Sequence, residues 1–382
     1  MKAKITSTIL LSLFLLGLPI WTFLTPKTDF SEMENRTLAS FPRLSVKSIT
    51  SRSFMDGLET WFSDHFVGRD IWVSAKGYIE FASGKRENNG IYICGDRLIQ
   101  HIDEPDQSKT EKNIEAITQF VDAFKKPTYL MLVPTAAEIH REKLPTGVQS
   151  WDQRAYIKEV AKQLRGTANE IDIYKVLFEN KDEYIYYRTD HHWTSHGAFC
   201  AFTEAADRMG ILTVQKNNYN VQNVSHNFFG TLYSKAGFRS ISPDIISRYE
   251  KRSSSVQATV DVFDGAKTST YPSMYFNEFL EKKDQYSMFL GQNQPIVTIQ
   301  TNTTSGKRLL IFKDSYAHAI APMFADYYTT ITLVDLRYIN QAYDTLIDVE
   351  QYDQVLLLYN VDTFSHSTDV AKLAITAKQV AD

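Results

Sequence analysis

The chain has 382 residues, of which 43% are hydrophobic and 23% are charged, and its formal net charge is −4. These values are ordinary for a folded protein of one large domain or two smaller ones, and they argue against a nucleic-acid binder. The only two cysteines, Cys94 and Cys200, form neither a disulfide framework nor a metal-site spacing, and whether they pair is left open.

The N-terminus has the features of a membrane anchor, which we assign to residues 1–25. Lys2 and Lys4 precede an uncharged stretch from Ile5 to Leu24, and twenty helical residues span about 30 Å, the thickness of a bilayer core. Basic residues before such a stretch place the rest of the chain on the extracytoplasmic face of the cell membrane. No A-x-A pattern precedes Pro26, so an uncleaved single-pass anchor is favoured over a cleaved signal segment, which would release a secreted protein.

Residues 26–85 are expected to form a polar linker and a helical stalk. Apolar side chains recur at spacings of three and four between Phe54 and Phe66, which predicts an amphipathic helix from Ser51 to Phe81. The stretch "NNGIYICGDRLIQ" then predicts a short hairpin, because Asn89-Gly90 and Gly95-Asp96 are turn formers.

Residues 86–382 alternate between helical and buried-strand patterns, which predicts an α/β domain with a parallel sheet flanked by helices. Residues of about 211–300 interrupt this rhythm and are expected to form an inserted, strand-rich subdomain or lid. The predicted helices are 107–125, 151–166, 195–210 and 316–328, and the predicted strands are 127–135, 169–177, 307–315, 329–337 and 352–362.

The strand "KRLLIFKDS" ends at a candidate nucleophile, Ser315. Ligands of open α/β sheets bind at the carboxyl ends of the strands, and a serine at a strand-to-helix elbow can be a nucleophile. Free N–H groups at the start of the following helix could hold an oxyanion. The alternative is that Asp314 or Ser315 merely caps that helix.

The stretch "RTDHHWTSHGAF", residues 188–199, favours an acid–base device. Asp190 and His192 are two residues apart, so both side chains can reach one face, where the carboxylate would orient the imidazole as a base for a serine. His191 would point the other way and is a secondary candidate, and Trp193 could pack on the imidazole or contact substrate. A metal site made of Asp190, His192 and His196, or a structural polar patch, remains an alternative.

Two further strand ends offer candidates for substrate binding. Thr135 closes the strand "LMLVPT", and Arg337 follows "TTITLVDL", so both are expected on the same sheet edge as Ser315. Arg337 could bind an anionic polymer or a sugar hydroxyl, although a salt bridge is the alternative.

The stretch "YYRTDHHWTSHGAF" resembles the signature of the DHHW family, which comprises membrane-anchored extracytoplasmic proteins, and "FSEMENRTLASFP", "LVPTAAEIHREKLP" and "FFGTLYSKAG" resemble other blocks of that family. The family in turn resembles the SGNH-hydrolase-like proteins of alginate O-acetylation. The resemblance implies an SGNH-hydrolase-like fold, with Asp190 orienting the base His192 and Ser315 as nucleophile. "KDSY" departs from the usual G-D-S-L block, because Lys313 stands where the glycine would be, which leaves the oxyanion-hole donors open.

Three functions follow as expectations. The first is a transferase that moves acetyl groups, supplied by a membrane-bound O-acyltransferase, onto hydroxyls of a cell-surface polysaccharide. The second is a carbohydrate O-acetyl esterase with the same triad, and the third is a non-catalytic surface scaffold. We expect no cofactor, no catalytic metal and no nucleic-acid partner. Transferase and esterase differ only in whether a sugar or water takes the acyl group, which the sequence does not decide.

Overall fold

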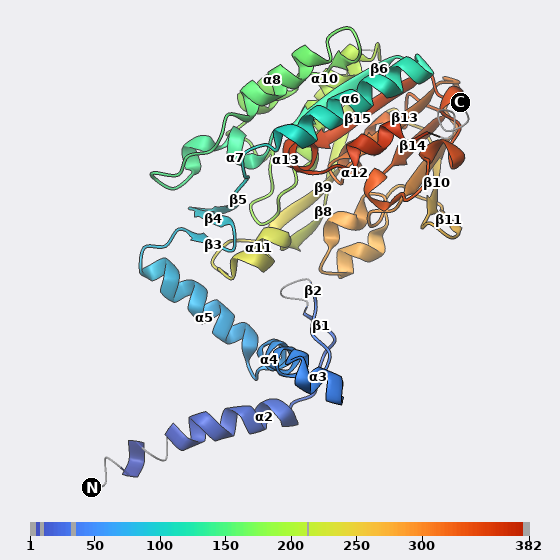
Figure 1. Ribbon diagram of the computed structural model, residues 1–382. Helices are drawn as coiled ribbons and strands as arrows, with labels where there is room; N and C mark the ends of the chain where they lie inside the picture. Colours follow the sequence, from blue (N-terminus) through green and yellow to red (C-terminus); the bar gives the residue numbers. More distant parts are fainter. Residues whose placement is uncertain (1–4, 8–10, 32–35, 212–213, 377–382) are drawn as a thin grey trace. The chain divides into compact units, whose positions relative to one another are not determined.

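The computed structural model describes residues 5–7, 11–31, 36–211 and 214–376 (Figure 1). The chain divides into two compact units, Met1–Asn89 with Tyr233–Ser240 and Gly90–Leu232 with Ile241–Asp382. Small parts of the predicted anchor, linker, insertion and C-terminus lie outside the described residues, namely 1–4, 8–10, 32–35, 212–213 and 377–382. The predicted site residues all belong to the second unit.

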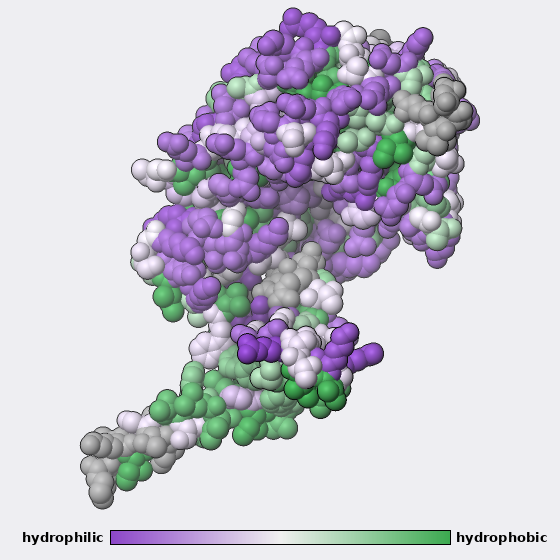
Figure 2. Space-filling view, viewed as in Figure 1, coloured by the Kyte–Doolittle hydropathy of each residue, from purple (hydrophilic) through white to green (hydrophobic). Residues whose placement is uncertain are grey.

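The predicted anchor contains a π-helical turn, η1 (Leu13–Gly17), followed by the helix α2 (Leu18–Leu24). Large apolar side chains of this stretch, such as Leu16 and Trp21, are exposed. Much of the surface of the N-terminal helical segment is coloured as hydrophobic in Figure 2. Within the described residues, no helix combines the length and the apolar run that a membrane crossing requires. The anchor therefore stays a prediction.

The predicted helix from Ser51 to Phe81 is two helices, α4 (Ser53–His65) and α5 (Arg69–Ala82). Gly68 separates them with a φ of 66°, a left-handed conformation that glycine adopts without a steric penalty. The single helix was wrong because the periodic apolar face ends at Phe66, two residues before this glycine. The other elements of the first unit are β1 (Phe30–Ser31), β2 (Arg36–Thr37), α3 (Val46–Thr50) and β3 (Glu87–Asn88).

The second unit is built on an eight-stranded mixed sheet in the order β11-β10-β12-β14-β13-β15-β6-β7. The strands from β14 to β7 in this order run parallel, whereas β12, β10 and β11 join antiparallel. The α/β class is confirmed, but a wholly parallel sheet was wrong. The strands are β6 (Thr128–Val133), β7 (Asn169–Glu170), β10 (Ala258–Phe263), β11 (Thr268–Tyr271), β12 (Ile296–Thr301), β13 (Arg308–Lys313), β14 (Thr330–Val334) and β15 (Gln354–Asn360).

Helices cover both faces of this sheet (Figure 1). Alternate side chains of β13 enter different cores, because Leu309 and Ile311 pack in one buried cluster and Leu310 and Phe312 in another. The first cluster includes side chains of α9 (Tyr174–Glu179), α10 (Ser195–Arg208) and α12 (Ala317–Ile320), and the second includes side chains of α6 (Gln107–Phe124), α8 (Gln153–Gln163) and α13 (Val361–His366).

The predicted insertion is only partly a separate feature. The strands β8 (Tyr219–Phe228) and β9 (Asp244–Lys251) form a hairpin that is not hydrogen-bonded to the main sheet. The helix α11 (Thr231–Ala236) lies in the chain segment that connects these two strands. In contrast, β10, β11 and β12 extend the main sheet, and each apolar strand gains a partner by pairing there. Residues 211–300 are thus rich in short strands, of which β8 and β9 form a sheet of their own and β10 to β12 belong to the main sheet.

Local predictions near the site differ in outcome. The hairpin of β4 (Ile91–Cys94) and β5 (Arg97–Gln100) is confirmed, as are α6, α8 and the start of α10 at Ser195. The strand expected over residues 169–177 is wrong, because β7 holds two residues and α9 follows. Its buried Tyr174 and Leu177 have helical spacing, which a short apolar run does not reveal.

The remaining elements are short. They are α7 (Ala136–Ile139), η2 (Arg141–Lys143), η3 (Lys216–Asn218), η4 (Asn277–Glu281), η5 (Gln285–Met288), η6 (Ala321–Phe324), η7 (Leu336–Tyr338), η8 (Tyr343–Thr345), η9 (Val349–Gln351) and η10 (Val370–Ala374). Cys94 and Cys200 are both buried and free.

Candidate active site

Ser315 lies in a tight turn between β13 and α12, and Asp314 holds that turn. One oxygen of Asp314 accepts a hydrogen bond from the main-chain N–H of Tyr316 at 2.9 Å, and the other accepts from the main-chain N–H of Asn360 at 2.7 Å. Asp314 thus ties the elbow to the neighbouring strand β15, while the Ser315 side chain stays partly exposed. The predicted helix of residues 316–328 is a single α-turn followed by η6, so the expected oxyanion role of its N-terminus loses its support.

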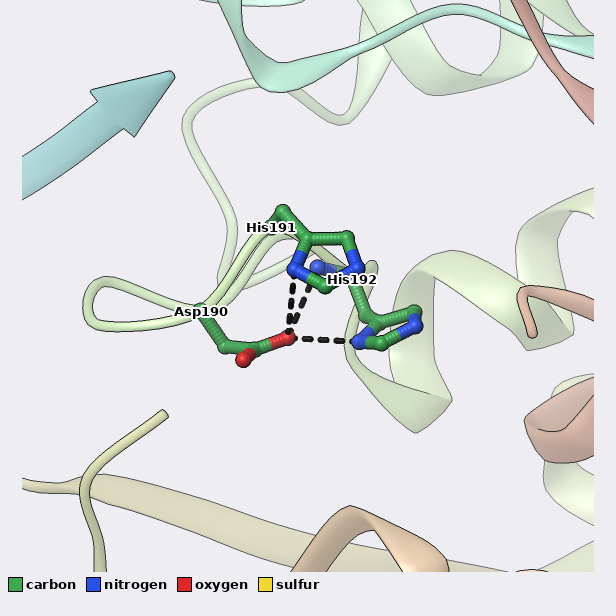
Figure 3. Close-up of side chains that lie close together, drawn as sticks. All are labelled: Asp190, His191 and His192. Atoms are coloured by element: carbon green, nitrogen blue, oxygen red, sulfur yellow. Dashed lines mark hydrogen bonds and ion pairs between the residues drawn. The ribbon is translucent and has the colours of Figure 1, made fainter. Parts of the chain in front are cut away.

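Asp190 and His192 lie in a closed loop between residues 186 and 193. Tyr186 and Trp193 form an isolated antiparallel bridge, and the N–H of Tyr187 donates to the carbonyl of His192 at 3.2 Å. Within the loop, the main-chain N–H of His192 donates to Asp190 Oδ1 at 3.0 Å, an Asx-type turn (Figure 3). The local backbone therefore fixes the carboxylate beside the imidazole.

One chain of hydrogen bonds joins the three predicted residues. Asp190 Oδ1 lies 2.5 Å from His192 Nδ1, and His192 Nε2 lies 2.7 Å from Ser315 Oγ. An ionised carboxylate accepts the proton of Nδ1, which leaves the lone pair of Nε2 directed at the serine hydroxyl. The arrangement can therefore remove a proton from Ser315 Oγ during attack on a carbonyl carbon.

The surroundings of Asp190 keep it ionised. Its Oδ2 accepts hydrogen bonds from Thr231 N at 2.8 Å and Thr231 Oγ1 at 3.0 Å. Burial alone would raise the pKa of Asp190, but the adjacent His191 and His192 and the hydrogen bonds from His192 and Thr231 outweigh burial and hold the pKa well below its ordinary value. Gly230 makes room for this carboxylate, because a Cβ at that position would lie 2.3 Å from Asp190 Oδ2.

A second buried carboxylate, Asp244 at the start of β9, fixes the backbone just before the Asp–His pair. It accepts hydrogen bonds from Arg188 N and Thr189 N, each at 2.8 Å, and from Thr189 Oγ1 at 2.5 Å. The Tyr184 hydroxyl also donates to it. These four donors satisfy the buried carboxyl group, although burial outweighs them and raises the pKa of Asp244 above its ordinary value. The hairpin β8–β9 thereby holds the loop that carries Asp190.

Lys313 does not obstruct the site in place of the usual glycine. Its side chain is fully buried and its ammonium donates to Asn293 Oδ1 at 3.0 Å, His318 Nε2 at 2.7 Å and Asp335 Oδ2 at 3.0 Å. Burial and the nearby Lys313 hold the pKa of His318 well below its ordinary value, so its neutral ring accepts from Lys313 and its Nδ1 donates to the carbonyl of Phe289 at 3.1 Å. These three hydrogen bonds fix Lys313 inside the protein, two residues before Ser315.

His191 and Trp193 flank His192 in the chain but differ in burial. The expectation that His191 points away from the Asp190–His192 pair is wrong, because its ring centroid lies 3.9 Å from that of His192 and its Nδ1 lies 3.7 Å from Asp190 Oδ1. The same nitrogen lies 2.8 Å from Thr231 Oγ1, and about a third of the side chain is exposed. Trp193 is completely buried, and its Nε1 donates to the carbonyl of Tyr316 at 3.1 Å. The predicted contact of Trp193 with substrate is therefore wrong, because the ring packs inside the protein and holds the residue after Ser315.

Thr135 and Arg337 are also engaged within the protein. Thr135 is buried, and its hydroxyl exchanges hydrogen bonds with the amide of Gln153 at 2.8 and 3.2 Å, so the predicted substrate contact is wrong. The Arg337 guanidinium donates two hydrogen bonds, of 2.8 and 2.6 Å, to the buried Asp335. The salt bridge that the sequence left as an alternative is therefore present. The Arg337 side chain stays 30% exposed.

Sequence reasoning missed the residues that surround the triad. Gly230 and Thr231 lie in the block "FFGTLYSKAG", so a family signal pointed to the segment although not to its role. Asp244 and Tyr286 stand in ordinary strand and turn patterns, which carried no signal.

The predicted metal set of Asp190, His192 and His196 does not come together as such, because His196 Nδ1 lies 3.3 Å from Glu183 Oε2. Among the described residues, the group with metal-site geometry is Asp190, His191 and His192, whose potential ligand atoms all lie within 4.8 Å of one another (Figure 3). However, both nitrogens of His192 are engaged, one by Asp190 and the other by Ser315, and His191 Nδ1 is engaged by Thr231. An ion at this cluster would have to break the hydrogen bonds that orient the imidazole.

We therefore expect that incubation with a chelator, followed by its removal, leaves the hydrolysis of a chromogenic acetyl ester unchanged within about twofold, since no step of acyl transfer by this triad needs an ion. Metal content by elemental analysis, measured before and after chelation, accompanies the assay. Stoichiometric zinc whose removal abolishes activity, and whose return restores it, would contradict this expectation.

Comparisons with known proteins agree with this fold. The family model described as DHHW protein matches residues 34–123 and 111–334. A DHHW family protein from Eubacterium siraeum is similar in structure, with 24% identity, a TM-score of 0.66, and coverage of 76% of this chain and 97% of that one. Bacillus cereus PatB1 with a sulfonyl adduct is similar at 17% identity and a TM-score of 0.61, covering 73% of this chain and 97% of that one.

A weaker structural match is the O-acetyltransferase domain of Pseudomonas putida AlgJ, with 14% identity, a TM-score of 0.46, and coverage of 76% of this chain and 97% of that one. No curated protein matches the chain. At these identities the likenesses to the DHHW family protein and to PatB1 show a shared fold.

Proposed function

Since the chain belongs to the DHHW family and a hydrogen-bonded Ser315–His192–Asp190 chain lies at its sheet edge, we propose that it is an acyltransferase that acts through a serine acyl-enzyme. The acyl group is acetyl, and the acceptor is a hydroxyl of a cell-surface polysaccharide. The observation that carries the proposal is the 2.7 Å separation of Ser315 Oγ from His192 Nε2, with Asp190 on the opposite nitrogen.

In the first half-reaction, His192 Nε2 takes the proton of Ser315 as Oγ bonds to the acetyl carbonyl carbon, and the imidazolium then returns that proton to the departing donor group. In the second half-reaction, His192 takes a proton from a sugar hydroxyl, whose oxygen attacks the acyl-enzyme. As that intermediate collapses, the imidazolium returns the proton to Ser315 Oγ, which leaves, and the acetyl group stays on the sugar. Asp190 stays ionised throughout and supports the imidazolium formed in each half.

The proposal includes the place and the partners of the reaction. The charge pattern of Lys2, Lys4 and the uncharged stretch from Ile5 to Leu24 supports a single-pass anchor with the domain on the extracytoplasmic face. The acetyl group is supplied by a membrane-bound O-acyltransferase, the partner that the resemblance to the alginate O-acetylation proteins implies.

The test uses the full-length protein in detergent, with a chromogenic acetyl ester as donor and oligosaccharides as acceptors. We expect release of the chromophore and, by mass spectrometry, an acetylated oligosaccharide, with neither product formed by Ser315→Ala. Chromophore release without acetylated sugar in any acceptor would replace the transferase with the esterase that shares this triad. A folded protein that is inert with every ester, and is not labelled by a sulfonyl fluoride, would favour the non-catalytic scaffold.

A further inference from the structure

Tyr286 stands over the catalytic pair, although it comes from a distant part of the chain. It belongs to the short helical turn η5, which precedes β12 in the chain, and only 5% of the residue is exposed. Its ring lies parallel to the imidazole of His192, with centroids 3.9 Å apart and an angle of 9° between the planes. One whole face of His192 is therefore covered by this ring.

The hydroxyl of the same side chain reaches the nucleophile. Tyr286 Oη donates a hydrogen bond to the main-chain carbonyl of Ser315 at 3.1 Å, and the N–H of His318 donates to that carbonyl at 3.2 Å. Burial raises the pKa of Tyr286 well above its ordinary value, so the hydroxyl keeps its proton and stays a donor. A single side chain thus contacts the base through its face and the backbone of the nucleophile through its tip.

The ring of Tyr286 is itself held in place. Tyr187 and Phe289 contact it edge-on, at centroid distances of 6.3 and 5.6 Å and interplanar angles of 88° and 61°. The preceding Gln285 is fixed by a hydrogen bond of 2.5 Å from Ser225 Oγ. These contacts leave the ring little freedom, which a positioning role requires.

We propose that Tyr286 is a positioning residue that sets the geometry of the Ser315–His192 pair and favours the imidazolium formed when the serine proton is transferred. The face of an aromatic ring attracts a cation, and here it also keeps water from one side of the imidazole. Tyr286 acts through His192 and Ser315, because its contacts are with the face of the imidazole and with the main-chain carbonyl of the serine. This inference rests on the proposed acyl-enzyme function.

The experiment separates the two contacts by comparing Tyr286→Phe, which keeps the ring, with Tyr286→Leu and Tyr286→Met, which lack it. The first readout is the second-order rate of sulfonylation of Ser315 by phenylmethylsulfonyl fluoride, followed by intact-protein mass. The second is kcat and KM for a chromogenic acetyl ester. The matched control is Tyr343→Leu, since Tyr343 is equally buried and donates to the carbonyl of Leu373 at 3.1 Å, but lies in the core on the opposite face of the sheet.

The ring-less variants should lose about a hundredfold in both the sulfonylation rate and kcat, because a misplacement of about 1 Å in a reacting pair has effects of that size. Their KM should change less than about twofold. Tyr286→Phe should recover most of the rate and stay within about tenfold of the parent, because it restores the stacked face and lacks only one neutral hydrogen bond. Tyr343→Leu should retain the parent kcat per folded molecule.

Three outcomes would overturn the inference. The first is a parent-like sulfonylation rate in a folded ring-less variant. The second is a rise in KM with kcat unchanged, which would make Tyr286 a substrate contact. The third is unfolding of both ring-less variants while Tyr343→Leu folds, which would make its role structural. A parent protein that neither reacts with the sulfonyl fluoride nor hydrolyses the ester would instead refute the proposed function, so the two failures are distinguishable.

Discussion

Ser315→Ala and His192→Ala should each reduce kcat/KM for a chromogenic acetyl ester by about three to six orders of magnitude, and the double variant should be little worse than either single one. The reason is that the two side chains act as one device: the hydroxyl is a weak nucleophile without the imidazole 2.7 Å away, and the imidazole has no proton to take without the hydroxyl. Steady-state kinetics and sulfonyl fluoride labelling of the four proteins check this result.

The neighbours of the pair supply the internal controls of that series. Asp190→Asn should lose less activity than Ser315→Ala, because the carboxylate orients the base and does not react. His191→Ala should be milder still, since His191 lies beside His192, Asp190 and Thr231 but the hydrogen bond to Ser315 Oγ comes from His192. Circular dichroism and thermal melting must show every variant folded, because losing a buried polar partner also destabilises a protein.

Two results would contradict the assignment. Full activity in folded Ser315→Ala would end the acyl-enzyme mechanism. Total loss in folded His191→Ala, together with intact activity in His192→Ala, would move the role of base to His191.

Gly230→Ala should lose about two to four orders of magnitude in kcat/KM, although residue 230 does not react. The added Cβ would lie 2.3 Å from both Cβ and Oδ2 of Asp190 and 2.7 Å from its Cγ, far inside van der Waals contact. Either the carboxylate moves away from His192 or the backbone of residues 229–231 withdraws, and then Thr231 N no longer holds Asp190 at 2.8 Å. The same overpacking should lower the free energy of unfolding by about 1–3 kcal/mol.

The measurement pairs ester kinetics with chemical denaturation, and Gly17→Ala is the matched control. A Cβ at Gly17 meets no atom within 4 Å, so that variant should keep the parent activity and stability. A folded Gly230→Ala protein with parent-like kcat/KM would show that the carboxylate does not need its present position.

The local parts of the site could be predicted because neighbouring residues determine them. Asp190 and His192 are two positions apart, and an Asx-type turn with the His192 N–H closes within the same three residues. Ser315 follows a strand whose residues 309–312 are all apolar, and the turn-forming Asp314 between them favoured a strand-to-helix elbow at this position. The resemblance to the DHHW family rests mainly on the stretch around Asp190 and His192, and the family match confirms it.

Burial and side-chain direction could not be predicted in the same way. Thr135 and Trp193 stand at positions where a residue could face substrate, yet both point into the protein, because Gln153 and the carbonyl of Tyr316 satisfy their polar atoms there. The sequence showed that Lys313 stands in the glycine position of the elbow, but it did not show that the ammonium is held by Asn293, His318 and Asp335.

The sequence by itself determined the chemistry that this protein offers: a carboxylate, an imidazole and a hydroxyl at a loop and a strand end, on an α/β framework. Only the tertiary structure decided that Ser315 meets His192 across 123 positions, and that Gly230, Thr231, Asp244 and Tyr286 complete the site. The physical reason is how far apart in the chain the interacting residues lie. Turns and strands follow from interactions among neighbours in the chain, whereas contacts between distant segments depend on how the hairpin β8–β9, the turn η5 and the sheet pack together.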